Sequence, residues 1–188
     1  MSTSNSISSP PPPEGDGGRP TIVFITGGAR SGKSRYAQEL ALQLSQQPVY
    51  VATARKWDAE FQQRIQRHQN DRDERWTSIE EEKHISQLGL QGRVVVIDCV
   101  TLWLTNFFID NKYDIDQCLV ECKQEIQQLQ QQAATFINIS NEIGMGVHAE
   151  TEIGRKFTDL QGWMNQYIAA VADKVTFMVS GIPMEIKK

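Results

Sequence analysis

One stretch of the sequence combines glycines, a lysine and a hydroxyl side chain at the spacing of a phosphate-binding loop. Residues 27–34 read GGARSGKS and match the P-loop pattern G-x-x-x-x-G-K-S. Glycines let the backbone curl so that its N–H groups point at a polyphosphate, and the N-terminal end of the next helix adds positive potential there. The residues that we expect to contact a nucleotide are Gly27, Gly28, Ala29, Arg30, Ser31, Gly32, Lys33 and Ser34.

The chemistry of this loop depends on two of its side chains. Lys33 is predicted to reach the β- and γ-phosphates as a catalytic group, and the Ser34 hydroxyl is predicted to bind Mg²⁺. A second metal ligand is expected at Asp98, because residues 93–98, RVVVID, read as an apolar strand that ends in a carboxylate, as a Walker B strand does. Such strands are common in α/β proteins, so the assignment of Asp98 depends on the P-loop.

The residues that flank the loop fit the elements that must position it. Residues 21–26, TIVFIT, are all β-branched or aromatic and predict a buried strand that leads into the loop. Beyond the loop, Tyr36, Leu40 and Leu44 form one stripe of a predicted amphipathic helix. A strand before the loop and a helix after it favour a P-loop over a glycine-rich turn.

Strands and helices alternate along the rest of the chain. Further strands are predicted at residues 48–52, 76–79, 135–140, 174–180 and 182–186, and helices at 59–69, up to Leu88, at 116–132 and at 150–171. This alternation after a P-loop predicts an α/β fold of the P-loop NTPase type, a mostly parallel sheet with helices on both faces.

Composition and charge narrow the class of protein. The chain has 188 residues, of which 39% are hydrophobic, and this suits one domain with a substantial core. We expect a disordered Ser/Pro/Gly-rich tail over residues 1–20 and a single P-loop domain over residues 21–188. A net charge of −4 provides no basic field for a nucleic-acid backbone, so we expect no nucleic-acid partner.

The cysteines and the apolar runs indicate in which cellular compartment the protein is expected. Cys99, Cys118 and Cys122 form neither an even disulfide set nor a C-x-x-C pair, and the last two read as small residues on one helix face. No apolar run approaches the roughly 20 residues of a membrane span, and the N-terminus has no hydrophobic signal core. We therefore expect a cytoplasmic protein without membrane insertion.

Two polar patterns admit a functional and a purely structural interpretation. Residues 111–114, NKYD, match the guanine-reading N-K-x-D element of switch GTPases, but the only D-x-x-G match, at residues 159–162, comes too late in the chain, which favours a solvated loop. Side chains from Glu60 onward recur every four positions and would share one helix face. That row comprises Glu60, Arg64, His68, Arg72, Trp76 and Glu80, and periodicity alone favours a solvated helix with salt bridges.

From Gly27 to its C-terminus, the sequence resembles the bifunctional adenosylcobinamide kinase and adenosylcobinamide-phosphate guanylyltransferase family of cobalamin synthesis. The matching segments are TGGARSGKSRYAQ, YVAT at 50–53, D-x-E at 58–60, RIQRH at 64–68, Trp76 with Glu80, DCVTLWLTN at 98–106, SNEIGMGV at 140–147, RKFTDLQGWMNQ at 155–166 and VSGIP at 179–183. Several long motifs in the family's order are more specific than a P-loop alone.

This resemblance implies a RecA-like P-loop enzyme, usually a homotrimer, with ATP, GTP and adenosylcobinamide as substrates. The enzyme would phosphorylate the aminopropanol hydroxyl of adenosylcobinamide and then transfer GMP from GTP to that phosphate through a GMP-histidine intermediate, giving adenosylcobinamide-GDP and pyrophosphate. The family's nucleophilic histidine maps to His68, whose neutral ring nitrogen can attack phosphorus without first losing a proton. By analogy, the guanosine contacts are Thr53, Ala54, Arg55, Arg72 and Glu80.

Some features leave alternatives open. His148 and Asp73 stand where the family commonly has proline, which affects the nucleotide contacts expected nearby. Arg155 is a candidate phosphate contact or, equally, the partner of Asp159 in an ion pair. The rival functions are a monofunctional small-molecule kinase, which needs no histidine nucleophile, and a non-catalytic nucleotide-binding module or switch.

Overall fold

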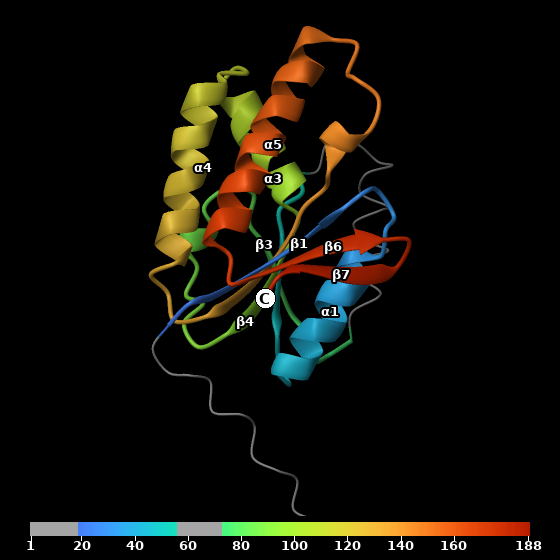
Figure 1. The fold of residues 1–188 in the computed structure, drawn as a ribbon. Coiled ribbons are helices and arrows are strands. Elements are labelled where there is room, and N and C mark those ends of the chain that lie inside the picture. The colour runs from blue at the N-terminus through green and yellow to red at the C-terminus, as the bar shows by residue number, and fades with distance from the viewer. Residues whose placement is uncertain (1–18, 56–72) are drawn as a thin grey trace, which may run out of the picture.

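The fold is built on one sheet, seen in a computed structural model that describes residues 19–55 and 73–188 (Figure 1). The sheet has the strand order β3-β2-β4-β5-β1-β6-β7, and only the β6–β7 pair is antiparallel. The strands are β1 (Thr21–Gly27), β2 (Val49–Ala52), β3 (Thr77–Glu80), β4 (Val94–Asp98), β5 (Thr135–Ile139), β6 (Lys174–Val179) and β7 (Ile182–Lys187).

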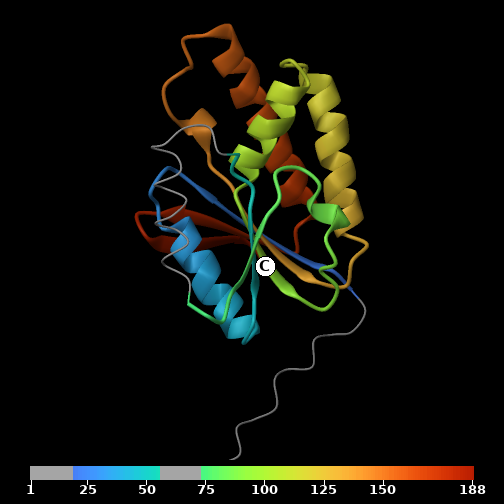
Figure 2. The same ribbon diagram turned by 180° about the vertical axis from the view of Figure 1, so that it is seen from behind.

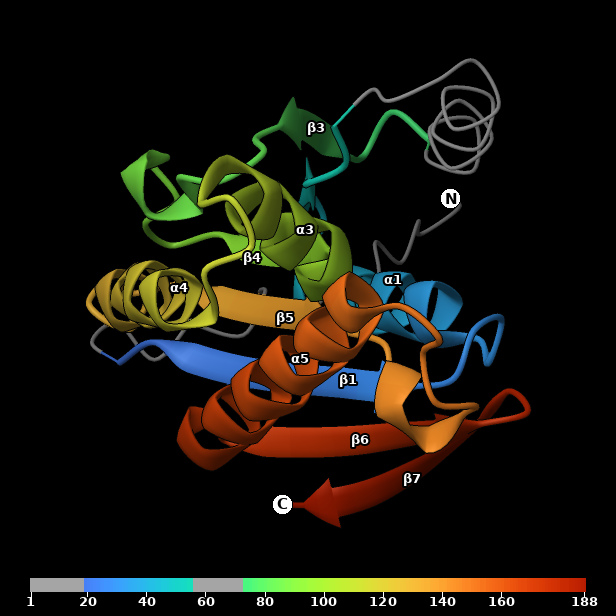
Figure 3. The ribbon, with the colours of Figure 1, turned by 90° about the horizontal axis from the view of Figure 1, so that it is seen from above.

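Helices cover both faces of this sheet, which confirms the predicted α/β P-loop architecture. They are α1 (Lys33–Leu44), α3 (Val100–Asp110), α4 (Ile115–Leu129) and α5 (Glu152–Val171). Figures 1 and 2 show α1 below the sheet and the other three helices above it, and Figure 3 looks down on those three. The strand order also separates β1 from β4 by β5, as expected of the RecA-like arrangement that the resemblance implies.

Strand β1 joins the two halves of the core because its side chains alternate between the faces. Ile22 and Phe24 pack with residues of α3, α4 and α5, whereas Val23 and Ile25 pack with α1. Both faces of β1 are therefore buried, as the unbroken apolar run predicted. The strand is consequently a rigid support for the loop that follows it.

The predicted apolar stripe of α1 is confirmed in part, because the most buried face lies one residue further along the helix. Ala37 and Ala41 are completely buried against the sheet, whereas Leu44 is 44% exposed, and Tyr36 and Leu40 lie at the edge of the contact. The helix starts directly from the phosphate-binding loop, so the loop sets its rotation, and small alanine side chains allow a close approach to the sheet.

The polar helix expected up to Leu88 is reduced to a 3-10 turn, Ile85–Gln87. Side chains of neighbouring segments occupy the backbone groups that a helix would need. Asn106 Nδ2 donates to the Glu82 carbonyl and Trp103 Nε1 to the Lys83 carbonyl, while Glu81 Oε1 accepts the Lys83 and His84 N–H groups. These tertiary bonds hold the segment in an irregular path.

Other expectations are confirmed or fall outside the described residues. Cys118 and Cys122 are both buried on the inner face of α4, as their spacing predicted. In the described ranges, no helix is long and apolar enough to cross a membrane. The helix predicted at residues 59–69, and the predicted tail apart from Arg19 and Pro20, lie outside those ranges.

Candidate active site

The loop between β1 and α1 has the backbone geometry that its glycines allow. Gly27 has φ of 149°, and a Cβ at this position would lie 2.5 Å from the Met178 carbonyl oxygen on β6. Gly32 has φ of 95°, with a Cβ position 3.2 Å from the Gly181 Cα. Residues with a side chain would strain both positions, so glycine is needed for the loop to curl beside β6.

Lys33 points into this curl from the first turn of α1. Its Nζ donates hydrogen bonds to the carbonyl oxygens of Gly27, at 3.0 Å, and Gly28, at 2.6 Å, and the residue is only 7% exposed. Burial lowers the Lys33 pKa, and the nearby Cys99, Asp98 and Glu142 oppose that shift. The structure thus places the ammonium group at the centre of the loop, where a polyphosphate would lie.

Ser34 and Asp98 lie side by side, as expected of two ligands of one metal. The Ser34 hydroxyl donates to Asp98 Oδ2 at 2.9 Å, and the Tyr50 hydroxyl donates to the same oxygen at 2.7 Å. A hydroxyl and a carboxylate are oxygen ligands of the kind that Mg²⁺ prefers. The two side chains could therefore hold Mg²⁺ together with nucleotide phosphates and water.

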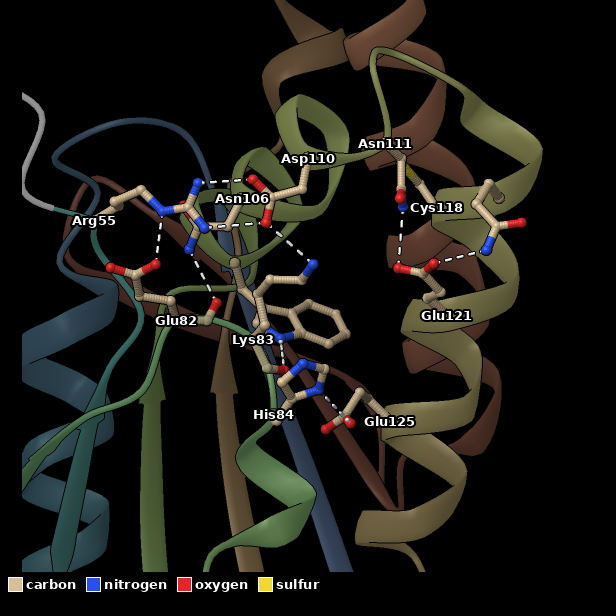
Figure 4. A network of polar contacts seen from close by, with 12 residues as sticks. Arg55, Glu82, Lys83, His84, Asn106, Asp110, Asn111, Cys118, Glu121 and Glu125 are labelled. Atoms are coloured by element: carbon tan, nitrogen blue, oxygen red, sulfur yellow. Dashed lines mark hydrogen bonds and ion pairs between the residues drawn. The ribbon is translucent and has the colours of Figure 1, made fainter.

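A second group of charged residues surrounds Arg55 beyond the end of β2 (Figure 4). Arg55 Nε donates to Glu82 at 2.6 Å, and its two terminal nitrogens donate to Asp110 at 2.9 and 3.1 Å. Lys83 Nζ also donates to Asp110, at 3.1 Å. Hydrogen bonds from Arg55, then Lys83, lower the pKa of Asp110 to about 2, and both acidic partners raise the pKa of Arg55.

The predicted guanosine contacts are distributed unevenly around this group. Ala54, Arg55 and Glu80 line a pocket of about 320 Å³ together with Glu82. Thr53, in contrast, is fully buried. Its hydroxyl is occupied, because it donates to the Cys99 carbonyl at 2.8 Å and accepts the Cys99 N–H at 2.9 Å. The Thr53 side chain thus fixes the end of β2 beside the end of β4.

Two residues at this edge of the sheet lie in the family-matching segments but were given no individual role from the sequence. Asn106 Nδ2 donates to the carbonyls of Thr53 and Glu82 and so connects α3 to both segments. Its sequence signal is a single amide in an otherwise largely apolar helix. Glu142, in the loop after β5, lies close enough to Lys33 to affect its pKa, and its signal is a carboxylate just beyond a buried strand.

The predicted nucleophile His68 and the predicted contact Arg72 lie outside the described residues. The other two histidines have local surroundings of their own. His84 Nδ1 is 3.3 Å from Glu125, a buried carboxylate of α4, and His148 lines a small pocket with Arg155 and Asp159. Among the described residues, His84 and His148 therefore occupy sites distinct from the P-loop.

The guanidinium of Arg155 bonds to backbone carbonyls just before α5, and its expected phosphate contact stays a prediction. Its guanidinium donates to the carbonyls of Ala149, at 3.2 Å, and Glu150, at 2.7 Å. No ion pair between Arg155 and Asp159 occurs among the described salt bridges. Arg155 thus closes the loop that precedes α5.

The N-K-x-D residues lie in the turn between α3 and α4, as the loop interpretation predicted. Asp114 caps α4 by accepting the Gln117 N–H at 3.0 Å, and the Asn111 amide donates to Glu121 at 3.0 Å. Lys112 and Tyr113 have positive φ angles of 52° and 68°. The side chains of Asn111 and Asp114 are thus used within the turn.

The family comparison covers most of the chain. The sequence model described as "Cobinamide kinase / cobinamide phosphate guanyltransferase" matches residues 23–186. The Pseudomonas aeruginosa "Bifunctional adenosylcobalamin biosynthesis protein CobP" is 38% identical over 172 residues, which cover 87% of this chain and 96% of that protein. The Escherichia coli "Bifunctional adenosylcobalamin biosynthesis protein CobU" is 36% identical over 181 residues, covering 88% and 99%.

Solved structures are more distant. The flagellar accessory protein FlaH from Methanocaldococcus jannaschii has a TM-score of 0.44 and 13% identity, covering 89% of this chain and 78% of that one. An ATPase from a bacterial type III secretion system has a TM-score of 0.49 and 8% identity, covering 84% and 50%. Both TM-scores are below 0.5, so the description of the fold depends on the strand order given above.

Proposed function

The chain belongs to the cobinamide kinase / cobinamide phosphate guanyltransferase family, and we propose that it phosphorylates adenosylcobinamide and then transfers GMP to the product. The observation that carries this proposal is the position of Lys33 in the curl of the P-loop, next to the Ser34–Asp98 pair. This arrangement provides a cation and two oxygen ligands where the phosphates of ATP or GTP would bind.

In the first reaction, the substrate hydroxyl attacks the γ-phosphorus of ATP or GTP. Lys33 binds the β- and γ-phosphates and offsets the charge that develops as the bond between them breaks. Ser34 and Asp98 would hold Mg²⁺, which supplies further positive charge at the phosphates. The P-loop N–H groups orient the nucleotide, so the chain contributes mainly position and electrostatic stabilisation.

In the second reaction, we propose that His68 carries GMP. A neutral imidazole nitrogen attacks the α-phosphorus of GTP, and pyrophosphate leaves with the electron pair of the broken bond. The phosphate of adenosylcobinamide phosphate then attacks the same phosphorus and releases His68. Support for this role comes from the resemblance of the RIQRH segment, residues 64–68, to the family pattern.

The guanosine part of GTP would lie in the pocket lined by Ala54, Arg55 and Glu80. Thr53 and Arg72 are further guanosine contacts that the family resemblance implies. Asp110 and Glu82 hold the Arg55 guanidinium from two sides, so its orientation is fixed before the nucleotide arrives. A fixed side chain loses little conformational entropy on binding. This rigidity supports Arg55 as a contact that helps to select the base or ribose.

We also propose that the chain assembles as a homotrimer, as the family resemblance implies. Strand β7 is the outer strand of the sheet beside β6, and its Ile182, Met184 and Ile186 side chains are largely exposed. Apolar side chains on an edge strand are suited to a contact between copies. Sedimentation equilibrium at several concentrations tests the trimer directly.

One labelling experiment separates the proposed function from its rivals. The protein is incubated with adenosylcobinamide and γ-labelled ATP, and separately with adenosylcobinamide phosphate and α-labelled GTP. The bifunctional enzyme labels the corrinoid in both reactions and releases pyrophosphate in the second. A monofunctional kinase labels it only in the first reaction, and a binding module labels it in neither, so either result would contradict the proposal.

A further inference from the structure

A second carboxylate, Glu142, lies beside the P-loop and has no part in the chemistry described so far. It follows β5, the strand between β1 and β4. Its backbone N–H donates to the Gly27 carbonyl at 3.2 Å, and its charge opposes the burial-induced lowering of the Lys33 pKa. Glu142 is therefore next to the place where the γ-phosphate would meet Lys33.

One oxygen of this carboxylate is held in place by neighbouring elements. Glu142 Oε1 accepts a hydrogen bond from the Thr26 hydroxyl at 2.6 Å and another from Asn165 Nδ2 at 3.0 Å. Asn165 is itself fixed, because its Oδ1 accepts from the Ser140 hydroxyl at 2.7 Å and from Gln161 Nε2 at 2.9 Å. Hydrogen bonds to such buried, well-held groups restrict a side chain to one orientation.

The other oxygen, Oε2, has no hydrogen bond to any group in the described ranges. Thr26 and Asn165 therefore fix the carboxylate through one oxygen and leave the second available to a substrate. This is the arrangement expected of a preorganised group that accepts a proton, because the acceptor atom must be placed without being occupied.

The two carboxylates near Lys33 have different surroundings, which separates their roles. Asp98 Oδ2 already accepts hydrogen bonds from Ser34 and Tyr50, so Asp98 is paired with Ser34, the other predicted metal ligand. Among the described residues, Glu142 has no hydrogen bond to Ser34 or Asp98, and it lies in the loop that follows β5. A carboxylate engaged with a metal is a poor proton acceptor, whereas Glu142 keeps an oxygen for that task.

We propose that Glu142 is the general base of the phosphorylation step, an inference that depends on the proposed kinase activity. The substrate hydroxyl oxygen forms a bond to the γ-phosphorus of the nucleotide, and its proton passes to Glu142 Oε2. The bond from the γ-phosphorus to the β-phosphate oxygen breaks, and its electron pair leaves with the nucleoside diphosphate. The resulting carboxylic acid returns its proton to water before the next turnover.

Guanylyl transfer does not need this base. The imidazole that attacks GTP is neutral and carries a free electron pair, and the acceptor phosphate is already ionised near neutral pH. Loss of the Glu142 carboxylate should therefore slow phosphorylation alone. The two reactions of one protein thus serve as internal controls for each other.

The test is the Glu142→Gln variant, because glutamine keeps an oxygen for the Thr26 and Asn165 hydrogen bonds but cannot accept the proton. We expect the kcat for adenosylcobinamide phosphorylation to fall by about 10²- to 10⁴-fold, the range for loss of a general base. Formation of the labelled GMP adduct and its transfer to adenosylcobinamide phosphate should stay unchanged. Glu150→Gln is the matched control, since Glu150 is an exposed carboxylate further along the same loop, and it should leave both reactions unchanged.

Glu142→Asp provides a second measurement, because it keeps a carboxylate but withdraws it by one methylene group. Its phosphorylation rate should lie between those of the wild-type protein and the Glu142→Gln variant. A wild-type phosphorylation rate in Glu142→Gln, or equal loss of both reactions, would overturn the assignment of Glu142. Absence of adenosylcobinamide phosphorylation by the wild-type protein would instead show that the proposed kinase function itself is wrong.

Discussion

The Ser34 hydroxyl donates a hydrogen bond of 2.9 Å to Asp98 Oδ2 from a position 64 residues away in the sequence. This bond joins the first turn of α1 to the end of β4. The Tyr50 hydroxyl supports the same oxygen from β2. Side chains from two other elements, α1 and β2, thus hold the β4 carboxylate that we assign to Mg²⁺.

The Asp98→Asn variant tests this assignment. The amide oxygen can still accept from Ser34, so the fold should be retained, but the loss of a negative ligand weakens metal binding. We expect the Mg²⁺ concentration for half-maximal phosphorylation to rise by about tenfold, which corresponds to a lost interaction of about 1.4 kcal/mol. Tyr50→Phe is the control that removes only a hydroxyl near the same oxygen. An unchanged Mg²⁺ dependence in Asp98→Asn would exclude Asp98 as a ligand.

The ion pair between Arg55 and Asp110 should raise the free energy of unfolding only at pH values where Asp110 is ionised. The pKa of Asp110 falls from 3.8 to about 2 in the folded protein, so the carboxylate contribution is complete above pH 3.8 and is lost as the pH falls through about 2. The wild-type protein should therefore be more stable than Asp110→Asn at pH 5, and the difference should shrink toward pH 2. Urea unfolding at a series of pH values measures this, and a constant difference would contradict the pKa shift.

Asp114→Ala tests the interpretation of residues 111–114 as a structural turn. Asp114 accepts the Gln117 N–H at the start of α4, and loss of an N-cap side chain costs about 1 kcal/mol. We expect the free energy of unfolding to fall by about that amount, while the affinities for GTP and ATP stay unchanged. Selective loss of GTP affinity would mean that Asp114 reads guanine after all.

The local part of the site follows from the sequence because its signals are close together. The strand before the loop, the glycines and the helix after it occupy adjacent residues, and the apolar run that ends at Asp98 marks its own strand. Motif spacing and periodicity are sufficient at this range. The pairing of Ser34 with Asp98 then follows from general knowledge of P-loop proteins.

The rest could not be predicted because it depends on partners that are distant in the sequence. Thr26 and Glu142 are 116 positions apart, and nothing in either local sequence indicates their contact. The irregular segment before Leu88 is held by Asn106 and Trp103 of α3, which override its helical pattern. The inner face of α1 depends on the rotation that the P-loop imposes. Tertiary contacts decide all of these features, and periodicity carries no information about them.

The central claim is that GMP passes through His68, and the most direct measurement is covalent labelling with α-labelled GTP followed by mapping of the labelled peptide. The wild-type protein should form an acid-labile, alkali-stable adduct on His68. His68→Asn should form none, because an amide nitrogen is not nucleophilic, and it should keep part of its kinase activity.

His148→Asn is the matched control for the same substitution, because His148 lies in the exposed loop before α5, and it should be labelled like the wild-type protein. Loss of both activities in a folded His68→Asn protein would indicate that His68 holds the nucleotide rather than carrying GMP. An adduct that persists in His68→Asn, or that maps to His84 or His148, would contradict the account.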